Sequence, residues 1–403
     1  MALRNISYYL DTDFLFSTLH FYSTMHFLIA PDAFKDSLTA QEACRAMAKG
    51  LASVSSDLTY EAFPMADGGE GTLEALVQKH QGSWLSLSAK DPLGREITAR
   101  YGVAADRKTA FIDLPQASGL MRLQQEERNP MKTSSYGTGQ LIRAAVEAGA
   151  ESLLIGIGGS ATSDAGMGIA QALGFVFEDE SGQVLEANGE NLSNIVRIVP
   201  SIWWEEYLHR VHVEVLCDVD NPLFGEDGAA YTYAPQKGAS PDQVVMLDQG
   251  LRQIASVWES AQGVQAHNTP GAGAAGGVGW GLMAFLDAQL TPGAQALMDY
   301  TGLAQAIAQK PAAILTGEGQ IDRQTQRGKV AHTLAQAAAK HDIPVIAFCG
   351  GLKLSYKEVR ALGLSAAHSI QTQPQPLERA LEDADKRLEE CVAQVVGTAW
   401  ALS

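Results

Sequence analysis

Apolar runs of strand length alternate with amphipathic stretches of helical length along most of the chain. Six runs have the composition of buried strands, namely FLIAPDAF, TYEAFP, SLLIGIG, VHVEVLCDV, AAILTG and PVIAFCG. Helices are expected over residues 70–80, 138–149, 241–262, 329–341 and 376–397, and another begins at Thr39, which has capping-box spacing to Glu42. This alternation predicts an α/β fold with helices packed against a mostly parallel sheet.

The segment from Asp91 to Tyr136 departs from this pattern. It carries PLG and QASGL turns and alternating apolar residues, which indicate a second domain with antiparallel character. The C-terminal third returns to strand and helix alternation, and 403 residues exceed a usual single core. We therefore expect a discontinuous first domain over residues 25–88 and 288–403, with a second α/β domain inserted over residues 89–287.

Residues 1–24 need a separate interpretation. They are rich in aromatic residues, lack the continuous apolar core of a signal peptide and are interrupted by Asp11 and Asp13. Met25 is followed at once by HFLIAP, which has the pattern of a buried first strand. We favour an N-terminal extension from an early start codon over a structural element of the fold, and both interpretations stay open.

Composition excludes several classes of protein. Hydrophobic residues make up 46% of the chain, charged residues 19%, and no apolar run is long enough to span a bilayer, which indicates a globular protein without a membrane role. A net charge of −17 opposes non-specific nucleic-acid binding. The four cysteines lie far apart without a CxxC pair, so neither a zinc site nor a disulfide framework is indicated, and a cytoplasmic location is expected.

The most informative stretch is Ile155–Gly174, IGIGGSATSDAGMGIAQALG. An apolar strand enters a Gly/Ser turn, and the pattern leaves the turn as a helix. Unpaired backbone N–H groups and the helix dipole would make such a turn an anion cradle that includes Gly158, Gly159 and Ser160. The other interpretation, a tight strand-to-helix connection without a ligand, stays open at this point.

Other chemistry-bearing residues share one setting, a strand end or a glycine-rich turn: Asp32, Lys35, Asp36, Asp67, Glu70, Ser134, Ser135, Asp218, Asp220, Asn221, Lys237, Glu318, Asp322, Arg323 and Lys329. Ligands of open α/β sheets bind beyond the carboxyl ends of the strands, where most of these residues would lie. Any one Asp or Lys could be a solvated or capping residue. Together they supply carboxylates for Mg²⁺ and cations for phosphate, the combination that phosphoryl transfer requires.

Searches for known motifs give negative results. GAGAAG at Gly271–Gly276 fits GxGxxG, but Pro270 argues against a preceding strand, and we interpret the segment as a close-approach turn. The GK at residues 328–329 lacks the first glycine of a P-loop and is followed by Val330. HExxH and GxSxG are absent, which excludes zinc and serine hydrolases of those types.

The set of motifs, in chain order, resembles the bacterial glycerate kinase family. The segments that carry the resemblance are PDAFKDSLTA, PMADGGEGT, TSSYGTGQLI, IGIGGSATSDAGMGIAQALG, CDVDNPLFG, APQKGA, PGAGAAGG and TGEGQIDRQT with the later GK. The resemblance implies a flavodoxin-like domain interrupted by a second α/β domain, and ATP-dependent phosphorylation of D-glycerate to 2-phosphoglycerate. The sequence departs from the family pattern in two places. Ser163 and Ala165 stand in SDAG where NDGG is expected, and Ala331 stands where a proline is expected after GKV. If the turn at Ala165 needs a positive φ, the alanine strains this turn and weakens nucleotide binding.

Residue roles follow as hypotheses from the demands of phosphoryl transfer. Asp220 is the candidate base, and Asp218, Glu318 or Asp322 would hold Mg²⁺. Contacts to phosphate, Mg²⁺ or glycerate are assigned to the remaining candidates: Lys35, Asp67, Ser134, Ser135, Gly158, Gly159, Ser160, Thr162, Asp164, Asn221, Lys237, Arg323 and Lys329. A kinase of another hydroxy acid, a kinase forming the 3-phosphate, and a non-catalytic nucleotide or organic-acid sensor stay open, as does a homo-oligomer.

Overall fold

The computed structural model describes residues 25–65, 72–207, 210–326, 330–373 and 376–402, which divide into two compact units. Unit 1 combines the N-terminal residues up to Pro64 with those from Ala304 onward, apart from Val330, and unit 2 is built from Met65–Leu303. No helix within the described residues is long and apolar enough to cross a lipid bilayer.

Unit 1 is built on a parallel five-stranded sheet with the order β13–β12–β11–β1–β2. The strands are β1 (His26–Ile29), β2 (Thr59–Ala62), β11 (Ala313–Ile321), β12 (Val345–Leu352) and β13 (Ala366–Ser369). Its helices are α2 (Ala40–Val54), α12 (Leu303–Ala308), the 3₁₀ helix η5 (Arg323–Gln326), α13 (Val330–Ala339), α14 (Tyr356–Ala361), α15 (Leu377–Glu382) and α16 (Ala384–Leu402). The parallel sheet within an α/β fold confirms the predicted class.

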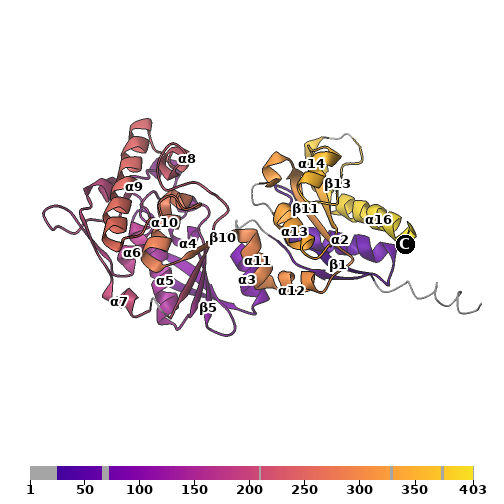
Figure 1. Ribbon diagram of the computed structural model, residues 1–403, viewed down its shortest axis with the longest axis horizontal. Helices are drawn as coiled ribbons and strands as arrows, with labels where there is room; N and C mark the ends of the chain where they lie inside the picture. The colour runs from indigo at the N-terminus through magenta and orange to yellow at the C-terminus, as the bar shows by residue number, and fades with distance from the viewer. Residues whose placement is uncertain (1–24, 66–71, 208–209, 327–329, 374–375, 403) are drawn as a thin grey trace, which may run out of the picture. The chain divides into compact units, whose positions relative to one another are not determined.

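The two ends of the chain meet in the core of unit 1. Helices α2 and α16, indigo and yellow in Figure 1, pack side by side. Phe27 and Ile29 of β1 share a core cluster with Met47 of α2 and Leu388 of α16. Leu28 points to the opposite face of the sheet and is also fully buried, so β1 is covered on both faces, as its continuous apolar sequence predicts.

Unit 2 is built on a mixed six-stranded sheet with the order β10–β9–β6–β5–β4–β3. The strands are β3 (Ser83–Lys90), β4 (Glu96–Val103), β5 (Thr109–Asp113), β6 (Ser152–Gly156), β9 (His212–Leu216) and β10 (Gln289–Thr291). The pairs β3–β4 and β4–β5 are antiparallel and the other pairs are parallel. A separate antiparallel pair joins β7 (Val176–Glu178) to β8 (Arg197–Val199).

The helical elements of unit 2 are, in chain order, α3 (Thr72–Lys79), α4 (Pro115–Ser118), η1 (Leu120–Arg122), η2 (Gln125–Glu127), α5 (Tyr136–Glu147), α6 (Met167–Ala172), η3 (Gly189–Asn194), α7 (Ile202–Glu205), α8 (Ala229–Tyr233), η4 (Pro235–Lys237), α9 (Pro241–Gln262), α10 (Ala274–Leu286) and α11 (Gly293–Thr301). Trp204, Trp280, Phe111 and Phe177 are among its largest buried side chains.

The division into units differs from the predicted domain boundaries. Among the described residues, the sequence placed 65, 72–88 and 288–303 with the discontinuous domain, whereas the structure places them in unit 2. The physical reason is strand pairing, because β3 pairs with β4 along its whole length and β10 pairs with β9. The antiparallel character expected after Asp91 is present, and the hairpin begins earlier, at Ser83.

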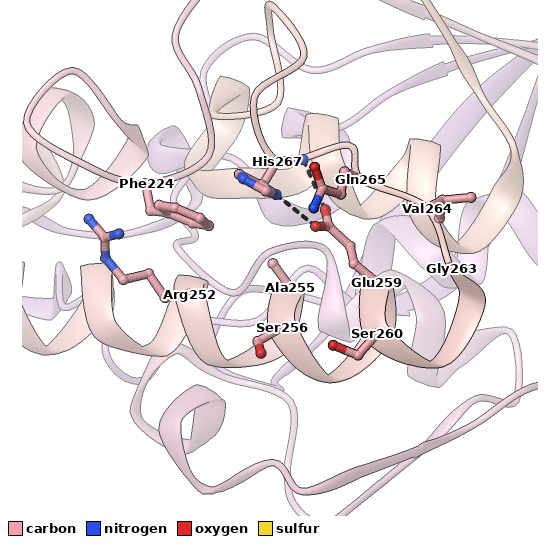
Figure 2. Close-up of a pocket in the computed structure, with 10 residues that line it drawn as sticks. All are labelled: Phe224, Arg252, Ala255, Ser256, Glu259, Ser260, Gly263, Val264, Gln265 and His267. Carbon is pink, nitrogen blue, oxygen red and sulfur yellow. Dashed lines mark hydrogen bonds and ion pairs between the residues drawn. The ribbon is translucent and has the colours of Figure 1, made fainter.

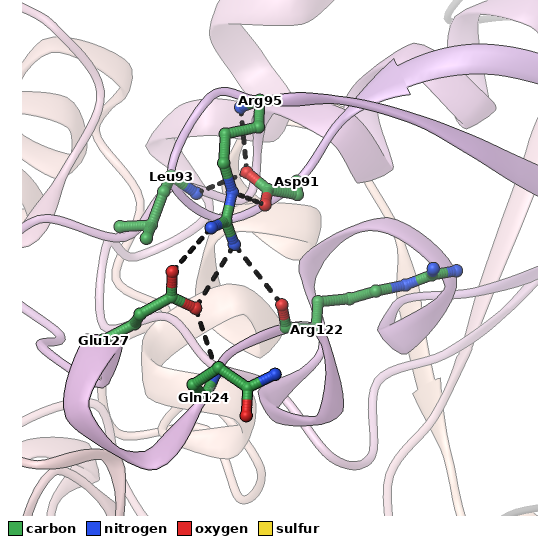
Figure 3. Close-up of polar contacts among 6 residues, drawn as sticks. All are labelled: Asp91, Leu93, Arg95, Arg122, Gln124 and Glu127. Carbon is green, nitrogen blue, oxygen red and sulfur yellow. Dashed lines mark hydrogen bonds and ion pairs between the residues drawn. The ribbon is translucent and has the colours of Figure 1, made fainter.

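The turn between β3 and β4 is fixed by a buried carboxylate (Figure 3). Asp91 accepts hydrogen bonds from the backbone N–H groups of Leu93 and Arg95, each at 2.9 Å, and its Oδ2 lies 2.5 Å from Arg95 Nε. Arg95 also contacts Glu127 Oε1 at 2.6 Å and donates to the carbonyl of Arg122. The hairpin is thereby attached to the end of η1 at Arg122 and to η2 at Glu127.

Candidate active site

A cavity of about 390 Å³ in unit 2 lies at the carboxyl ends of β6 and β9. Residues that follow these two strands form two of its walls, and η4 and the start of α10 form the others. The lining residues are Leu120, Ile157, Gly158, Gly159, Ser160, Leu216, Cys217, Asp218, Val219, Tyr233, Gln236, Lys237, Ala274 and Ala275. The position agrees with the general rule for ligand sites of α/β sheets, and we call this cavity the strand-end pocket.

The glycine turn after β6 presents backbone N–H groups at the strand-end pocket. Gly158 and Gly159 are exposed, and their N–H groups donate to no acceptor within the described part of the chain. Gly159 has φ +67°, a conformation that glycine adopts without strain. Successive free N–H groups in a turn form a concave site suited to an anion.

The helix after this turn does not contribute to the anion site as the sequence predicted. Helix α6 begins only at Met167, and the buried segment 161–164 separates it from Gly159. The first amides of the helical segment are already occupied, since Gly166 N and Gly168 N donate to the carboxylate of Asp164 at 3.3 and 3.2 Å. The expected anion cradle is therefore the turn alone.

Lys237 places a cationic group against the same turn from within the protein. Its side chain is buried, and Nζ donates to the carbonyl of Thr162 at 2.6 Å and to Ser160 Oγ at 3.2 Å. Burial lowers the pKa of Lys237 to about 7, and the charge of Asp164 opposes this shift. Ser160 Oγ in turn contacts the carbonyl of Ala275 at 3.1 Å, so the turn, η4 and the start of α10 form one connected wall.

Asp164, which was predicted to contact phosphate, Mg²⁺ or glycerate, is fully buried and does not line the strand-end pocket. Besides the two glycine amides, it accepts hydrogen bonds from Ser135 N and Ser135 Oγ, both at 2.7 Å. Burial raises the pKa of Asp164, while these hydrogen bonds act in the opposite direction. The contacts indicate a residue that holds α6 against the start of α5, without a surface that could meet a substrate.

The two predicted serines lie at the same junction, where Ser135 is buried and Ser134 is partly buried. Ser135 Oγ donates to Asp164 and accepts a hydrogen bond from Ile169 N at 3.1 Å. Ser134 Oγ accepts from Tyr136 N at 3.2 Å. Neither serine lines the strand-end pocket.

Residues after β9 reach the strand-end pocket in different ways. Asp218 lines it, and its Oδ1 accepts the N–H of Gly293 at the start of α11 at 2.8 Å. Asp220 is exposed. Burial raises the pKa of Tyr233, and the acidic groups of Cys217 and Asp220 add to this shift. Asn221 acts through Tyr233, whose hydroxyl donates to Asn221 Oδ1 at 2.6 Å.

A second group of predicted residues lies in unit 1, at the carboxyl ends of β1 and β11. Lys35 is exposed in the turn after β1, and a side chain at Gly319 would lie 3.2 Å from Lys35 N, so this turn packs against β11. Glu318 is buried and accepts a hydrogen bond from Thr325 Oγ1 at 3.1 Å. Asp322 Oδ2 accepts from Gln320 Nε2 at 2.5 Å.

The remaining predicted residues are more separated. Arg323 is exposed and forms an ion pair with Glu358 at 3.2 Å. Asp67 and Lys329 lie outside the described residues. Asp218 belongs to unit 2, whereas Glu318 and Asp322 belong to unit 1. Among the described residues, no three His, Cys, Asp or Glu side chains gather into a metal site.

The GAGAAGG segment forms part of the wall of the strand-end pocket. From the sequence it was interpreted only as a close-approach turn. Ala275, Gly276 and Gly277 all have positive φ. A Cβ at Gly276 would lie 2.0 Å from the carbonyl oxygen of Thr162, so only glycine fits there. The alanines of this segment, and Tyr233 and Gln236, were missed because such residue types carry no chemical signal in a sequence.

The structure meets the condition set for Ala165, and the weaker nucleotide binding expected from it stays a prediction. Its φ is +52°, in the left-handed region that favours glycine. Ala165 N donates to the carbonyl of Gly276 at 3.2 Å, so the strained residue joins the segment after the glycine turn to the pocket wall.

Comparisons with known proteins agree on one family. The sequence model of the glycerate kinase family matches residues 27–400. Glycerate 2-kinase of Escherichia coli K12 is 41% identical over 360 residues, covering 89% of this chain and 94% of that protein. Glycerate kinase of Halalkalibacterium halodurans is 42% identical over 374 residues, covering 93% and 98%. A crystal structure assigned to glycerate kinase 2 of Salmonella typhimurium LT2 superposes with a TM-score of 0.82 at 38% identity, covering 94% and 99%.

Proposed function

The chain belongs to the glycerate kinase family, and from this premise we propose that it transfers the γ-phosphoryl group of ATP to the 2-hydroxyl of D-glycerate, forming 2-phosphoglycerate. The family relationship supports the enzyme class, the phosphate donor and glycerate as acceptor. The name of the relative from Escherichia coli supports the 2-hydroxyl.

One observation carries the proposal at the level of residues, namely the buried Lys237 behind the free N–H groups of Gly158 and Gly159. Phosphoryl transfer is catalysed mainly by positioning and by stabilising negative charge. A glycine turn with a cation beside it supplies both, because the turn fixes the phosphate oxygens and the ammonium group offsets their charge. We assign this wall to the phosphate groups, with Ser160 positioned by Lys237.

The acceptor hydroxyl needs a base within reach. Asp220 is our candidate, because it is an exposed carboxylate on the segment that also brings Asp218 to the strand-end pocket. Asp164 and Ser135 we assign to positioning, since they hold the junction of α5 and α6 below the glycine turn. Lys35 and Arg323, which belong to unit 1, are separate candidates for contact with an anionic substrate group.

Mg²⁺ is proposed to accompany ATP. Proteins commonly bind Mg²⁺ through one or two carboxylates while the substrate phosphates and waters complete the octahedron, so a cluster of three protein ligands is not required. The candidate carboxylates are alternatives: Asp218 lines the strand-end pocket of unit 2, and Glu318 or Asp322 would serve in unit 1. When bound, the ion neutralises phosphate charge and holds the phosphate oxygens in place.

The test is initial-rate ADP release in a coupled assay with ATP, Mg²⁺ and D-glycerate, with controls that lack glycerate or Mg²⁺. Enolase added directly to the product distinguishes the two phosphate esters, because only 2-phosphoglycerate is its substrate. We expect glycerate-dependent ADP release and immediate enolase turnover. Turnover that requires a phosphoglycerate mutase would move the reaction to the 3-hydroxyl, and folded protein without glycerate-dependent ADP release would refute the proposal.

A further inference from the structure

Glu259, near the end of α9, does not line the strand-end pocket, and its carboxylate accepts four hydrogen bonds. Its side chain is 8% exposed. Oε1 accepts the backbone N–H groups of Ala266 and His267, each at 2.9 Å, and the indole N–H of Trp280 at 3.0 Å, and Oε2 accepts from His267 Nδ1 at 2.6 Å. Figure 2 shows the facing side chains of Glu259 and His267 at a second cavity of about 510 Å³. We call the four residues Glu259, Ala266, His267 and Trp280 the Glu259 clamp.

The Glu259 clamp requires a carboxylate. Burial tends to raise the pKa of Glu259, but the hydrogen bonds from Ala266, His267 and Trp280 outweigh burial and lower it. The group is therefore ionised and accepts from four donors. An isosteric glutamine keeps only one acceptor oxygen: an N–H₂ group at the Oε1 position faces three N–H donors, and at the Oε2 position it faces the Nδ1–H of His267 unless the imidazole changes its tautomer.

The loop held by the clamp leads directly to two walls of the strand-end pocket. The carbonyl of His267 accepts the N–H of Leu223 at 2.9 Å, and the carbonyl of Asn221 accepts the N–H of Gly273 at 2.9 Å. These bonds join the loop to the segment that contains Asp218. The chain then continues from Gly273 into Ala274 and Ala275, which line the pocket.

The clamp also fixes the helix that carries the second of these walls. Trp280 lies on α10, and its backbone N–H donates to the carbonyl of Ala272 at 3.0 Å while its indole donates to Glu259. The carbonyl of Ala275 contacts Ser160 Oγ, which Lys237 also contacts. Only a few covalent and hydrogen bonds separate the loop held by Glu259 from the groups assigned to phosphate. A displacement of this loop would therefore also move those groups.

We propose that Glu259 is a positioning residue for phosphoryl transfer, which with His267 fixes the relative placement of the Asp218 segment and the Ala274–Ala275 wall. The inference rests on the proposed function. Displacements of about 1 Å at a reacting centre can lower rates by about two orders of magnitude, so a loop anchor outside the pocket can control turnover.

The test is the kinetics of Glu259→Gln, with Ser201→Ala as the matched control. Ser201 is a buried residue of unit 2 whose Oγ caps α7 through Trp204 N at 3.0 Å, and it does not line the pocket. We expect Glu259→Gln to lower kcat at least tenfold with KM for glycerate changed less than threefold, and Ser201→Ala to keep kcat within twofold of the unchanged protein.

A second pair of variants keeps the proposal testable if Glu259→Gln does not fold. His267→Asn places an amide donor near the position of Nδ1, whereas His267→Ala removes the donor. We expect the alanine variant to lower kcat at least fivefold and the asparagine variant to restore most of it. Equal kcat in both variants would contradict a role for this hydrogen bond.

The ¹⁵N–¹H signal of the Trp280 indole reports on the clamp independently of turnover. It is assigned among the six tryptophans by Trp280→Phe and should shift in Glu259→Gln. A shifted signal with unchanged kcat would mean that Glu259 is only structural, which overturns the inference while leaving the proposed function intact. Absence of glycerate-dependent turnover in the protein without substitutions would overturn both the proposed function and the role of Glu259.

Discussion

Replacing Lys237 with methionine should make the protein more stable and less active. The lysine is 3% exposed, and burial lowers its pKa from 10.5 in the unfolded chain to about 7 in the folded protein. Because the folded pKa is the lower one, the unfolded chain binds more protons between these two values, and stability rises with pH across that window. Below pH 7 Lys237 is charged in the folded protein, so the loss of stability caused by burying this charge is greatest there.

The magnitude follows from the pKa shift. A difference of about 3.5 pKa units at about 1.36 kcal/mol per unit gives a cost of about 5 kcal/mol at pH 6, which falls to about 2 kcal/mol at pH 9. Methionine removes this cost and loses hydrogen bonds to Ser160 and Thr162, worth about 1–2 kcal/mol. The carbonyl of Thr162 keeps Ser160 Oγ at 3.3 Å as a partner. The free energy of unfolding of the methionine variant should therefore be about 3 kcal/mol higher than that of the protein with Lys237 at pH 6.

Urea unfolding at pH 6, 7.5 and 9 measures the difference in free energy of unfolding between the two proteins. We expect the difference to shrink by about 3 kcal/mol from pH 6 to pH 9, while kcat/KM for ATP falls at least tenfold. Lys132→Met, at an exposed lysine of the same unit, is the matched control and should show a constant difference. A constant difference for Lys237→Met would refute a buried charge that titrates near pH 7.

Three further substitutions test other parts of the site. Asp220→Asn keeps the shape of the side chain and removes its basicity, so kcat should fall about 100-fold or more, and near-normal turnover would exclude Asp220 as the base. Lys35→Met should raise KM for an anionic substrate, and unchanged kinetic constants would remove Lys35 from the site. Gly276→Ala brings a Cβ within 2.0 Å of the Thr162 carbonyl at φ +74° and should lower the unfolding free energy by more than about 3 kcal/mol, whereas Gly182→Ala, at φ +80° with no atom within 4 Å, should cost about 1 kcal/mol.

The elements that the sequence predicted well are those whose local signals agree. The helix over 241–262 has the same limits in the structure, because Ser240 and Gln243 form a capping box, Pro241 occupies its first turn and Gly263 ends it in a left-handed conformation. The helix expected over 376–397 is two helices that meet at Asp383. That segment contains neither glycine nor proline inside it, so no local signal marks the break.

The candidate site was predictable in its residue types and less so in their roles. The glycine turn and Lys237 both line the strand-end pocket, and a sequence cannot show that the lysine is buried. Asp164 follows a Gly/Ser turn and has the local features of a ligand-binding carboxylate. Its role depends on Ser135, 29 positions earlier in the chain, whose N–H and hydroxyl it accepts. Only tertiary structure brings such donors together.

Ala165 shows how the same tertiary contacts explain a departure from the expected motif. A left-handed alanine costs about 1–2 kcal/mol relative to an ordinary conformation, and the cost persists where surrounding contacts determine the backbone. Here α10 approaches so closely that a Cβ at Gly281 would lie 2.2 Å from the carbonyl oxygen of Ala165, and Gly276 accepts its N–H. Glycines on α10 thus provide the space that lets an alanine occupy this turn, so the strain at Ala165 and the close packing at Gly276 and Gly281 belong to one interface, which fixes the wall of the strand-end pocket.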